Sequence, residues 1–113
     1  MYYIYVLGCE DGSLYCGITT DIKRRIHAHF YRLAECAKYT KSHQVVSVEA
    51  VWQTEDATAA RKLEYRFKQL KRSEKLLLLA SPDKISDFIP SLENCGFFYR
   101  KDINLDFCLE KQN

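Results

Sequence analysis

The stretch Tyr15–Phe30, Tyr-Cys-Gly-Ile-Thr-Thr-Asp-Ile-Lys-Arg-Arg-Ile-His-Ala-His-Phe, decides the fold and carries most of the candidate functional groups. A short β-capable run ends at a glycine, and the Thr-Thr-Asp segment that follows is a helix-capping signal. Within the predicted helix, Arg25 and His29 are four residues apart and therefore share one face. A tyrosine, an arginine and a histidine beside a glycine are suited to chemistry on phosphate groups.

The residues before this helix predict a β-hairpin. The segments Tyr2–Leu7 and 14–18 are rich in aromatic and β-branched residues, and Glu10-Asp11-Gly12 lies between them. The length of the loop sets the register, because a slip of one residue turns every side chain to the other face of the sheet.

Two registers are compatible with the sequence. A three-residue loop with Gly12 in the left-handed conformation pairs Leu7 with Tyr15 and Tyr5 with Gly17, so that both tyrosines lie on one face and Gly17 leaves space beside Tyr5. A two-residue loop would separate the tyrosines. We expect the first register because it creates a shared polar face.

Helical spacing continues beyond the hairpin. Thr20 is predicted to cap a helix over residues 21–34, whose apolar positions are Ile22, Ile26, Phe30 and Leu33. Residues 36–44 are predicted to form a polar, basic connection, and residues 45–52 a third strand that alternates as Val46, Val48, Ala50 and Trp52.

The second half of the chain is predicted to be mainly helical. Thr54 or Asp56 can cap a helix whose apolar positions are Ala60, Leu63, Phe67 and Leu70, and a further helix is expected over residues 73–79. We predict an α+β fold in the order β-β-α-β-α-α plus a C-terminal tail. Its sheet is expected to be small, three-stranded, mainly antiparallel and flanked by helices.

Length and composition indicate a globular chain. With 113 residues, 47% of them hydrophobic and 28% charged, the chain is long enough for one core. We predict a domain over residues 1–80 and an extension over 81–113 that packs on the domain or on a second copy, giving a monomer or a weak homodimer. The longest apolar run, residues 76–80, is far below the roughly 20 residues of a membrane span, and we expect a cytoplasmic protein.

Cysteine usage and charge add two expectations. The five cysteines include no Cys-x-x-Cys pair and are expected to be free and mostly buried. Net charge is only +2, but residues 20–43 carry six Lys and Arg against two acidic residues. A basic middle region favours a polyanionic partner.

Five separated elements resemble the GIY-YIG nuclease domain, above all its small stand-alone bacterial versions. They are Tyr3-Ile4-Tyr5, Tyr15-Cys16-Gly17, Arg25, His29 and Glu64. The run from Asp11 to Asp21 and the segments Ala37-Lys38-Tyr39-Thr40 and Glu64-Tyr65-Arg66-Phe67-Lys68-Gln69-Leu70 are also similar to that subgroup. Tyr3 and Cys16 depart from the name-giving motifs, but neither position supplies a functional side chain in the family.

The resemblance implies metal-dependent hydrolysis of a phosphodiester. It gives the catalytic set Tyr5, Tyr15, Arg25, His29 and Glu64, with Glu64 as the ligand of one Mg²⁺ or Mn²⁺ ion. Arg25 would clamp phosphate oxygens, and His29 would assist proton transfer. Either tyrosine could be the general base.

Contacts to nucleic acid are expected from basic and aromatic side chains around this set: Arg24, Lys38, Tyr39, Lys41 and Lys68. Two functions remain open. One is an endonuclease acting on DNA, branched or single-stranded DNA included, in repair or recombination. The other is a non-catalytic module with the same fold that binds nucleic acid or protein. A protein partner could supply specificity in either case.

Overall fold

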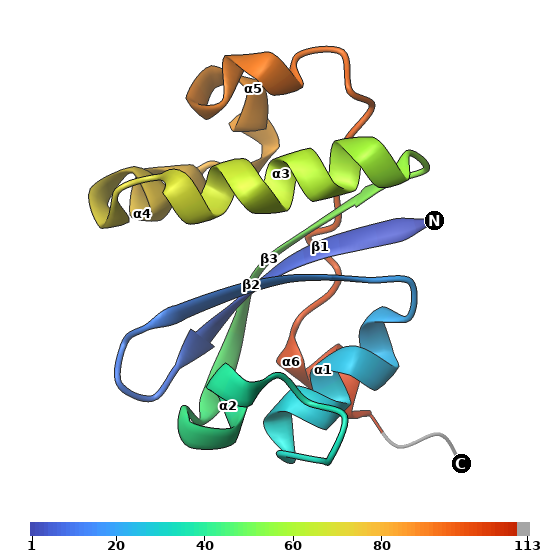
Figure 1. Cartoon of the computed structure of the whole chain (residues 1–113), viewed down its shortest axis with the longest axis vertical. Helices are drawn as coiled ribbons and strands as arrows, with labels where there is room; N and C mark the ends of the chain where they lie inside the picture. The colour runs from blue at the N-terminus through green and yellow to red at the C-terminus, as the bar shows by residue number, and fades with distance from the viewer. Residues whose placement is uncertain (111–113) are drawn as a thin grey trace.

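A four-stranded antiparallel sheet lies between two layers of helices (Figure 1). The structure is a computed structural model that describes residues 1–110. The strands, in the spatial order β2-β1-β3-β4, are β1 (Tyr2–Cys9), β2 (Leu14–Thr19), β3 (Val45–Thr54) and β4 (Phe98–Tyr99). The helices are α1 (Ile22–Phe30), α2 (Lys38–Ser42), α3 (Ala57–Gln69), α4 (Arg72–Ala80), α5 (Ile85–Phe88) and α6 (Leu105–Leu109), with short 3₁₀ turns at Pro82–Lys84 and Pro90–Leu92.

The predicted α+β class with an antiparallel, helix-flanked sheet is confirmed, but the sheet has four strands rather than three. The fourth strand, β4, contributes only the pairs Tyr99 with Trp52 and Phe98 with Gln53. Two residues are too short to produce an alternating pattern in the sequence. Residues 111–113, the last three of the extension expected over 81–113, lie outside the described residues.

The hairpin has the three-residue register. Leu7 pairs with Tyr15, and Tyr5 pairs with Gly17. The turn is closed by hydrogen bonds from the Cys9 amide to the Ser13 carbonyl and from the Gly12 amide to the Cys9 carbonyl. Gly12 has φ = +84°, the left-handed conformation that this loop requires.

The two faces of the sheet form separate cores. One face packs against α3, α4 and α5 through a mainly apolar cluster that includes Ile4, Val6, Ala50, Trp52, Leu63, Phe67 and Leu78. The other packs against α1, α2 and α6 and includes Tyr5, Leu7, Ile22, Ile26, Val45, Val51 and Ile103. Figure 1 shows α3 on one side of the sheet and α1 on the other.

Helix α1 is shorter than predicted at both ends. Its N-cap is Asp21, whose side chain accepts a hydrogen bond from the Arg24 amide, and not Thr20. The helix ends at Phe30, and Arg32 follows with φ = +53°, a left-handed conformation that stops helical hydrogen bonding. The predicted end at residue 34 was wrong, because apolar spacing alone does not show where a chain turns.

Strand β3 extends to Thr54 and breaks the predicted alternation. Ala50 and Trp52 face the apolar core, whereas Val48 packs with the opposite core and Val46 is exposed. The pairing with β1 contains two register shifts, between Val6 and Leu7 and between Gly8 and Cys9. A bulge reverses the side-chain phase, so a single alternating pattern does not describe the whole strand.

Residues 36–44 contain helix α2, where a connection was predicted. The helix is only five residues long and begins without a side-chain cap, which explains the weak signal. His43 is its C-cap residue, and the His43 amide donates a hydrogen bond to the Tyr39 carbonyl.

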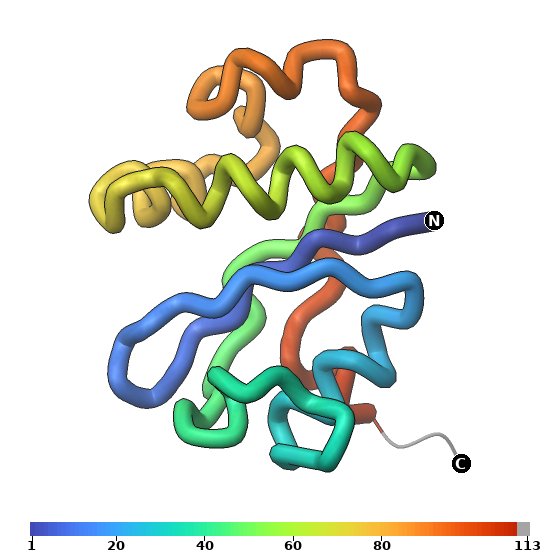
Figure 2. The backbone as a smooth tube through the Cα atoms, viewed as in Figure 1, coloured from blue at the N-terminus to red at the C-terminus, as the bar shows by residue number. Residues whose placement is uncertain are grey.

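Residues 81–110 connect the two helical layers. Ile85, Ile89 and Leu92 join the apolar core on the α3 side, whereas Ile103 and Cys108 are buried on the α1 side. Figure 2 shows the chain passing from α5 beside the sheet to the opposite layer. Within residues 1–110, no helix has the length and apolar character needed to cross a membrane.

The thiols agree with the expectation from the sequence. All five cysteines are free, and Cys95 is the one that is half-buried rather than buried.

Candidate active site

Three elements bring four of the predicted side chains together beside β2. Tyr5 comes from β1, Tyr15 from β2, and Arg25 and His29 from successive turns of α1. The rings are close: centroids are 6.3 Å apart for Tyr5 and Tyr15, 5.6 Å for Tyr5 and His29, and 5.2 Å for Tyr15 and His29. The hairpin register and the spacing of four residues in α1 produce this cluster.

A line of hydrogen bonds, buried at its centre and half-buried at both ends, runs through the cluster. Arg25 Nε donates to the Tyr5 hydroxyl at 3.4 Å, and Tyr5 Oη lies 2.7 Å from His29 Nε2. On the other side of the ring, His29 Nδ1 is 2.7 Å from Thr40 Oγ1, and the Thr40 hydroxyl donates to the Ala37 carbonyl at 3.0 Å. Tyr5, His29 and Thr40 are each 0% exposed. No role for Thr40 was predicted from the sequence.

Gly17 provides the space for this arrangement. A Cβ atom at this position would lie 2.6 Å from Tyr5 Cζ and 3.2 Å from Tyr15 Cε1. Real Cβ atoms do not approach ring carbons as closely as the first of these distances. Any side chain larger than glycine would therefore displace Tyr5.

Burial sets the protonation states of Tyr5 and His29. Burial raises the pKa of the Tyr5 phenol well above its ordinary value, although the hydrogen bond from Arg25 opposes this shift. Burial, and then the positive charge of Arg25, lower the pKa of His29 to about 4. At neutral pH the pair therefore consists of a neutral phenol and a neutral imidazole.

Arg25 stays charged at the mouth of the cluster. Burial opposes the charge, but the hydrogen bond to Tyr5 and the nearby Tyr15 hydroxyl raise the pKa of Arg25 overall. A second nitrogen, Nη1, donates to the Glu35 carbonyl, and the Glu35 carboxylate pairs with Arg24 at 3.0 Å. Both arginines line a hollow of about 230 Å³ beside the start of α1.

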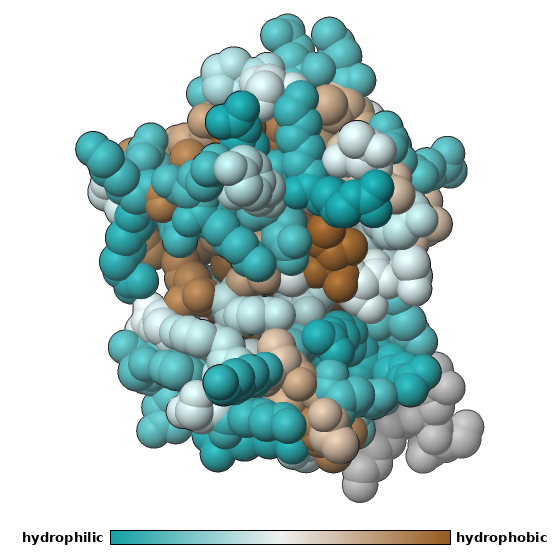
Figure 3. All heavy atoms as spheres, viewed as in Figure 1, coloured by the Kyte–Doolittle hydropathy of each residue, from teal (hydrophilic) through white to brown (hydrophobic). Residues whose placement is uncertain are grey.

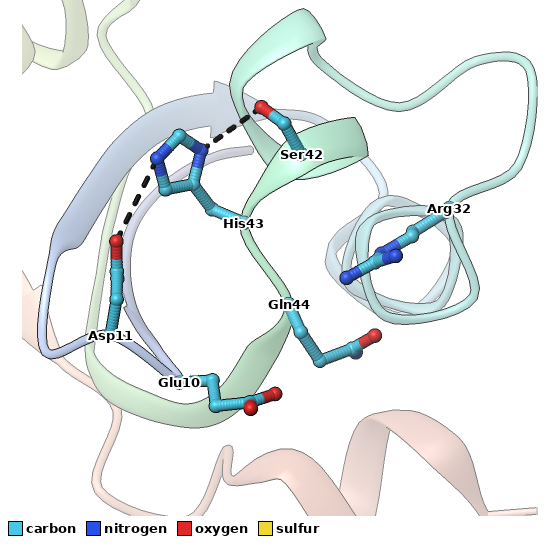
Figure 4. A pocket seen from close by; sticks show the side chains of 6 residues that line it. All are labelled: Glu10, Asp11, Arg32, Ser42, His43 and Gln44. Atoms are coloured by element: carbon cyan, nitrogen blue, oxygen red, sulfur yellow. Dashed lines mark hydrogen bonds and ion pairs between the residues drawn. The ribbon is translucent and has the colours of Figure 1, made fainter.

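An aromatic stack extends from Tyr15 to α2. The Tyr39 ring is nearly parallel to Tyr15, with centroids 5.9 Å apart, and stacks on His43 at 3.9 Å. His43 Nδ1 donates to the Tyr39 carbonyl, and its Nε2 is 3.7 Å from Asp11 in the hairpin loop. Figure 4 shows His43 between Asp11 and Ser42 at the rim of a polar hollow. These contacts fix α2 against the hairpin.

Glu64 lies on the other side of β2. It is on α3, half-buried, and its carboxylate is 3.5 Å from the Lys68 ammonium. Helix α3 packs against β2, and burial and then the Glu64 charge raise the pKa of Cys16, a β2 residue, to about 12. Tyr15 and Gly17 flank Cys16 on β2 and face the opposite side of the sheet. Tyr15 belongs to the cluster on that side, and Gly17 leaves space for Tyr5.

The edge of β2 therefore separates the Glu64 carboxylate from the tyrosine, arginine and histidine cluster. Figure 3 shows hydrophilic side chains above and below a paler band that crosses this face at the level of β2 in Figure 1. Among residues 1–110, no group of three or more His, Cys, Asp or Glu side chains is placed to hold a metal ion.

The predicted nucleic-acid contacts surround this edge on two layers. Lys38 and Lys41 are exposed on α2, on either side of Tyr39 in the sequence, and Arg24 is exposed on α1. Lys68 is exposed on α3, one helical turn from Glu64. Both faces of the β2 edge thus present cations.

Comparisons with known proteins identify the family of the chain. Residues 1–76 match the GIY-YIG catalytic domain. A UPF0213 protein of Fusobacterium nucleatum is 40% identical over 93 residues, which cover 82% of this chain and 88% of that protein. A UPF0213 protein of Halobacterium salinarum is 37% identical over 75 residues, 66% of this chain and 95% of that protein.

A solved structure is also similar to this chain. The solution NMR structure of a UPF0213 protein from Bacillus halodurans is 35% identical, covers 76% of this chain and 94% of its own, and has a TM-score of 0.45. With a matching domain over residues 1–76 and relatives that it covers almost completely, the chain belongs to the GIY-YIG nuclease superfamily, among its UPF0213 proteins.

Proposed function

We propose that the chain is an endonuclease that hydrolyses phosphodiester bonds in DNA with the help of one divalent metal ion. One observation carries the proposal: a charged guanidinium, a half-exposed tyrosine and a buried tyrosine–histidine pair converge beside the edge strand β2. Such a set can clamp a phosphate and move a proton, which are two requirements of phosphodiester hydrolysis.

Arg25 is the phosphate clamp of this proposal. Its guanidinium is half-buried, permanently charged and oriented by Tyr5 and by the Glu35 carbonyl. A planar guanidinium binds two phosphate oxygens with defined geometry, and fixing its orientation in advance reduces the entropy lost on binding.

The two tyrosines have different roles in this proposal because their exposure differs. Tyr15 is half-buried and can contact an attacking water, whereas Tyr5 is 0% exposed and bonded to His29. We assign Tyr15 to the water and the Tyr5–His29 pair to the interior, where it can hold a proton. The sequence alone left both tyrosines as candidate bases.

Glu64 is suited to a magnesium or manganese ion. Its carboxylate is half-buried, and within residues 1–110 its one ion-pair partner is the exposed Lys68. Mg²⁺ typically binds one or two carboxylates, with waters and substrate phosphates as its other ligands. When bound, the ion would supply charge stabilisation at the phosphate.

DNA is the proposed substrate, and its backbone would lie across the edge of β2. Arg24, Lys38 and Lys41 on one side and Lys68 on the other can contact phosphates, while Tyr39 can contact sugar or base with the edge of its stacked ring. A role in repair or recombination, a cytoplasmic location and a partner that supplies specificity remain predictions.

Cleavage of branched, single-stranded and duplex DNA with Mg²⁺ or Mn²⁺ tests the proposal. We expect Arg25→Lys and Glu64→Gln to reduce the rate by a factor of about 100 or more, because each removes charge stabilisation or its geometry. The matched controls are Arg61→Lys and Glu55→Gln, two exposed positions outside the cluster. These should cleave as the unsubstituted protein does.

Two results would contradict the proposal. One is the absence of product from the unsubstituted protein on every substrate and with either metal. The other is equal cleavage by Glu64→Gln. Salt-dependent DNA binding that survives Glu64→Gln without any product would instead indicate the non-catalytic nucleic-acid-binding module.

A further inference from the structure

We propose that Thr40 is a positioning residue: its hydroxyl holds His29 in the tautomer that carries its proton on Nδ1 and leaves Nε2 free to accept the proton of Tyr5. The chemical use of this arrangement rests on the proposed nuclease function. The placement of the proton on His29 does not, and it can be measured separately.

The number of hydrogens on the Thr40 hydroxyl limits how it can contact His29. A hydroxyl group has one hydrogen to donate and two lone pairs that accept. The Thr40 hydroxyl donates its hydrogen to the Ala37 carbonyl at 3.0 Å, and a carbonyl can only accept. With that hydrogen used, we assign Nδ1 of His29 as the donor across its contact of 2.7 Å with Thr40 Oγ1.

The neutral imidazole determines the direction of the hydrogen bond between His29 and Tyr5. With its proton on Nδ1, a neutral ring carries only a lone pair on Nε2. Tyr5 must then donate its phenolic hydrogen across the distance of 2.7 Å to Nε2, while its oxygen accepts from Arg25 Nε. All the hydrogen bonds in the line then donate in the same direction, from Arg25 toward the Ala37 carbonyl.

The burial of His29 and the charge of Arg25 also favour a neutral imidazole. Burial and the charge of Arg25 lower the pKa of His29 to about 4, and the ring is 0% exposed. In the described part of the chain, no buried side-chain nitrogen or oxygen lacks a hydrogen-bond partner. With all the bonds donating in the same direction, each polar group of the cluster has a hydrogen-bond partner while the imidazole stays neutral.

The tautomer decides whether a proton can leave Tyr5. With Nε2 free, the Oη–H bond of Tyr5 can break as an Nε2–H bond forms, which gives a phenolate paired with Arg25 and an imidazolium whose Nδ1–H stays on Thr40. Burial disfavours both ions, so the pair rests in its neutral form and the transfer is a transient step. With the proton on Nε2 instead, His29 would donate to Tyr5. No acceptor would then remain in this line for the Tyr5 proton.

Helix α2 is anchored well enough to hold Thr40 in place. Thr40 is 0% exposed and sits in the middle of the helix, next to the stacked ring of Tyr39. At the end of α2, His43 donates a hydrogen bond to the Tyr39 carbonyl. The same side chain lies 3.7 Å from Asp11 of the hairpin (Figure 4). The orientation of the Thr40 hydroxyl is therefore set by contacts outside α1.

Two substitutions separate the hydroxyl from its surroundings. Thr40→Val has nearly the same shape but no hydroxyl, whereas Thr40→Ser keeps the hydroxyl and loses a methyl group. Long-range ¹H–¹⁵N spectra of the imidazole ring report which nitrogen carries the proton, and the backbone amide spectrum reports that each variant is folded. Neither measurement depends on nuclease activity.

We expect His29 to carry its proton on Nδ1 in the unsubstituted protein and in Thr40→Ser, and to lose this single tautomer in Thr40→Val. A proton on Nε2 in the unsubstituted protein, or an undisturbed Nδ1–H tautomer in folded Thr40→Val, would overturn the proposal. If Thr40→Val does not fold, Thr40→Ala serves as the second variant, because it also lacks the hydroxyl but relieves any crowding.

Cleavage kinetics then test whether the reaction depends on the Nδ1–H tautomer of His29. We expect Thr40→Val to reduce kcat by about 10-fold or more at nearly unchanged KM, and Thr40→Ser to restore most of it, since only proton transfer is affected. Unchanged kcat in a variant whose tautomer has shifted would refute the link to the reaction. If even the unsubstituted protein fails to cleave, the proposed function fails, while the spectra still decide the role of Thr40 in orienting His29.

Discussion

The two faces of the sheet are built on different principles. Toward α3 the core is mainly apolar and is stabilised by close packing of side chains such as Leu63, Phe67 and Trp52, with one hydrogen bond from the Trp52 indole to the Pro82 carbonyl. Toward α1 the core encloses a hydroxyl, an imidazole and a phenol linked by hydrogen bonds. Burying polar groups is costly even when each has a partner, so stability alone does not account for the second face.

Most of the candidate functional groups of this small domain therefore lie on the polar face of the sheet. The apolar face can tolerate exchange of side chains of similar volume, because dispersion and burial are not directional. The polar face depends on the position of each hydrogen, so its members are not interchangeable. Substitutions on the first face should change stability, and those on the second should change stability and chemistry together.

Leu78→Ala should have the largest effect on stability. Leu78 is 0% exposed in the apolar core, and truncating a buried leucine costs about 3 kcal/mol, within a range of roughly 2–5. Leu77→Ala is the matched control, because the neighbouring side chain is 61% exposed and its loss should cost less than about 0.5 kcal/mol. Urea unfolding measures both, and similar losses would show that α4 is not packed as described.

His29 should make the stability depend on pH. The folded state holds the pKa of His29 near 4, whereas an unfolded histidine titrates near about 6.5. Between these values the unfolded state binds more protons, so stability falls as the pH falls through this window, by up to about 3 kcal/mol in total.

The variant His29→Gln isolates this effect. Glutamine cannot titrate, so the difference in unfolding free energy between pH 7.5 and pH 4 should be smaller in His29→Gln than in the unsubstituted protein. Substitution of the exposed His27 by Gln, on the same helix, provides the control. An identical pH dependence for all three proteins would mean that His29 is not buried in the neutral form.

Tyr5→Phe should cost less stability but remove the chemistry. The phenylalanine ring fills the same space, and the loss comes from leaving His29 Nε2 without a donor, about 1–2 kcal/mol. Tyr2→Phe, on the same strand and with its ring half-buried, should be close to neutral. Full nuclease activity in Tyr5→Phe would contradict the assigned role of the phenol.

Lys68→Ala should have the smallest effect. The pair joins the exposed Lys68 to the half-buried Glu64, four residues apart on α3, at 3.5 Å, and pairs of this spacing contribute about 0.3–0.5 kcal/mol. Raising the salt concentration should reduce even this contribution. A loss above about 1 kcal/mol would show that the Glu64 side of β2 is as tightly organised as the buried cluster.

Local sequence patterns predicted the parts of the site that local geometry determines. The loop at Glu10–Gly12 fixes the register that brings Tyr5 opposite Gly17, and the spacing of Arg25 and His29 places them on one face of α1. A glycine opposite a tyrosine also predicted the space that the phenol occupies. These relations can be predicted from the spacing at which side chains share a face in a strand or in a helix.

The parts that were missed depend on contacts between distant segments. Thr40 is polar, lies in a basic stretch and has no periodic signal, so its burial against His29 could not be read from the residues around it. A buried threonine could have been suspected only from its place in the segment Ala37–Thr40 that resembles the family. The reversal of phase in β3 and the short β4 likewise arise from pairing, not from local preference.

The segment that crosses beside the sheet has a consequence for synthesis of the chain on the ribosome. Helix α6 packs against α1, and Lys23 of α1 lies over the Phe107 ring at 4.7 Å, so the layer that carries Arg25 and His29 is completed by residues translated some eighty positions later. Contacts of such long sequence separation form late. A nascent chain can build the hairpin early, but the layer that holds the reactive cluster gains its full cover only after residue 109 has left the exit tunnel.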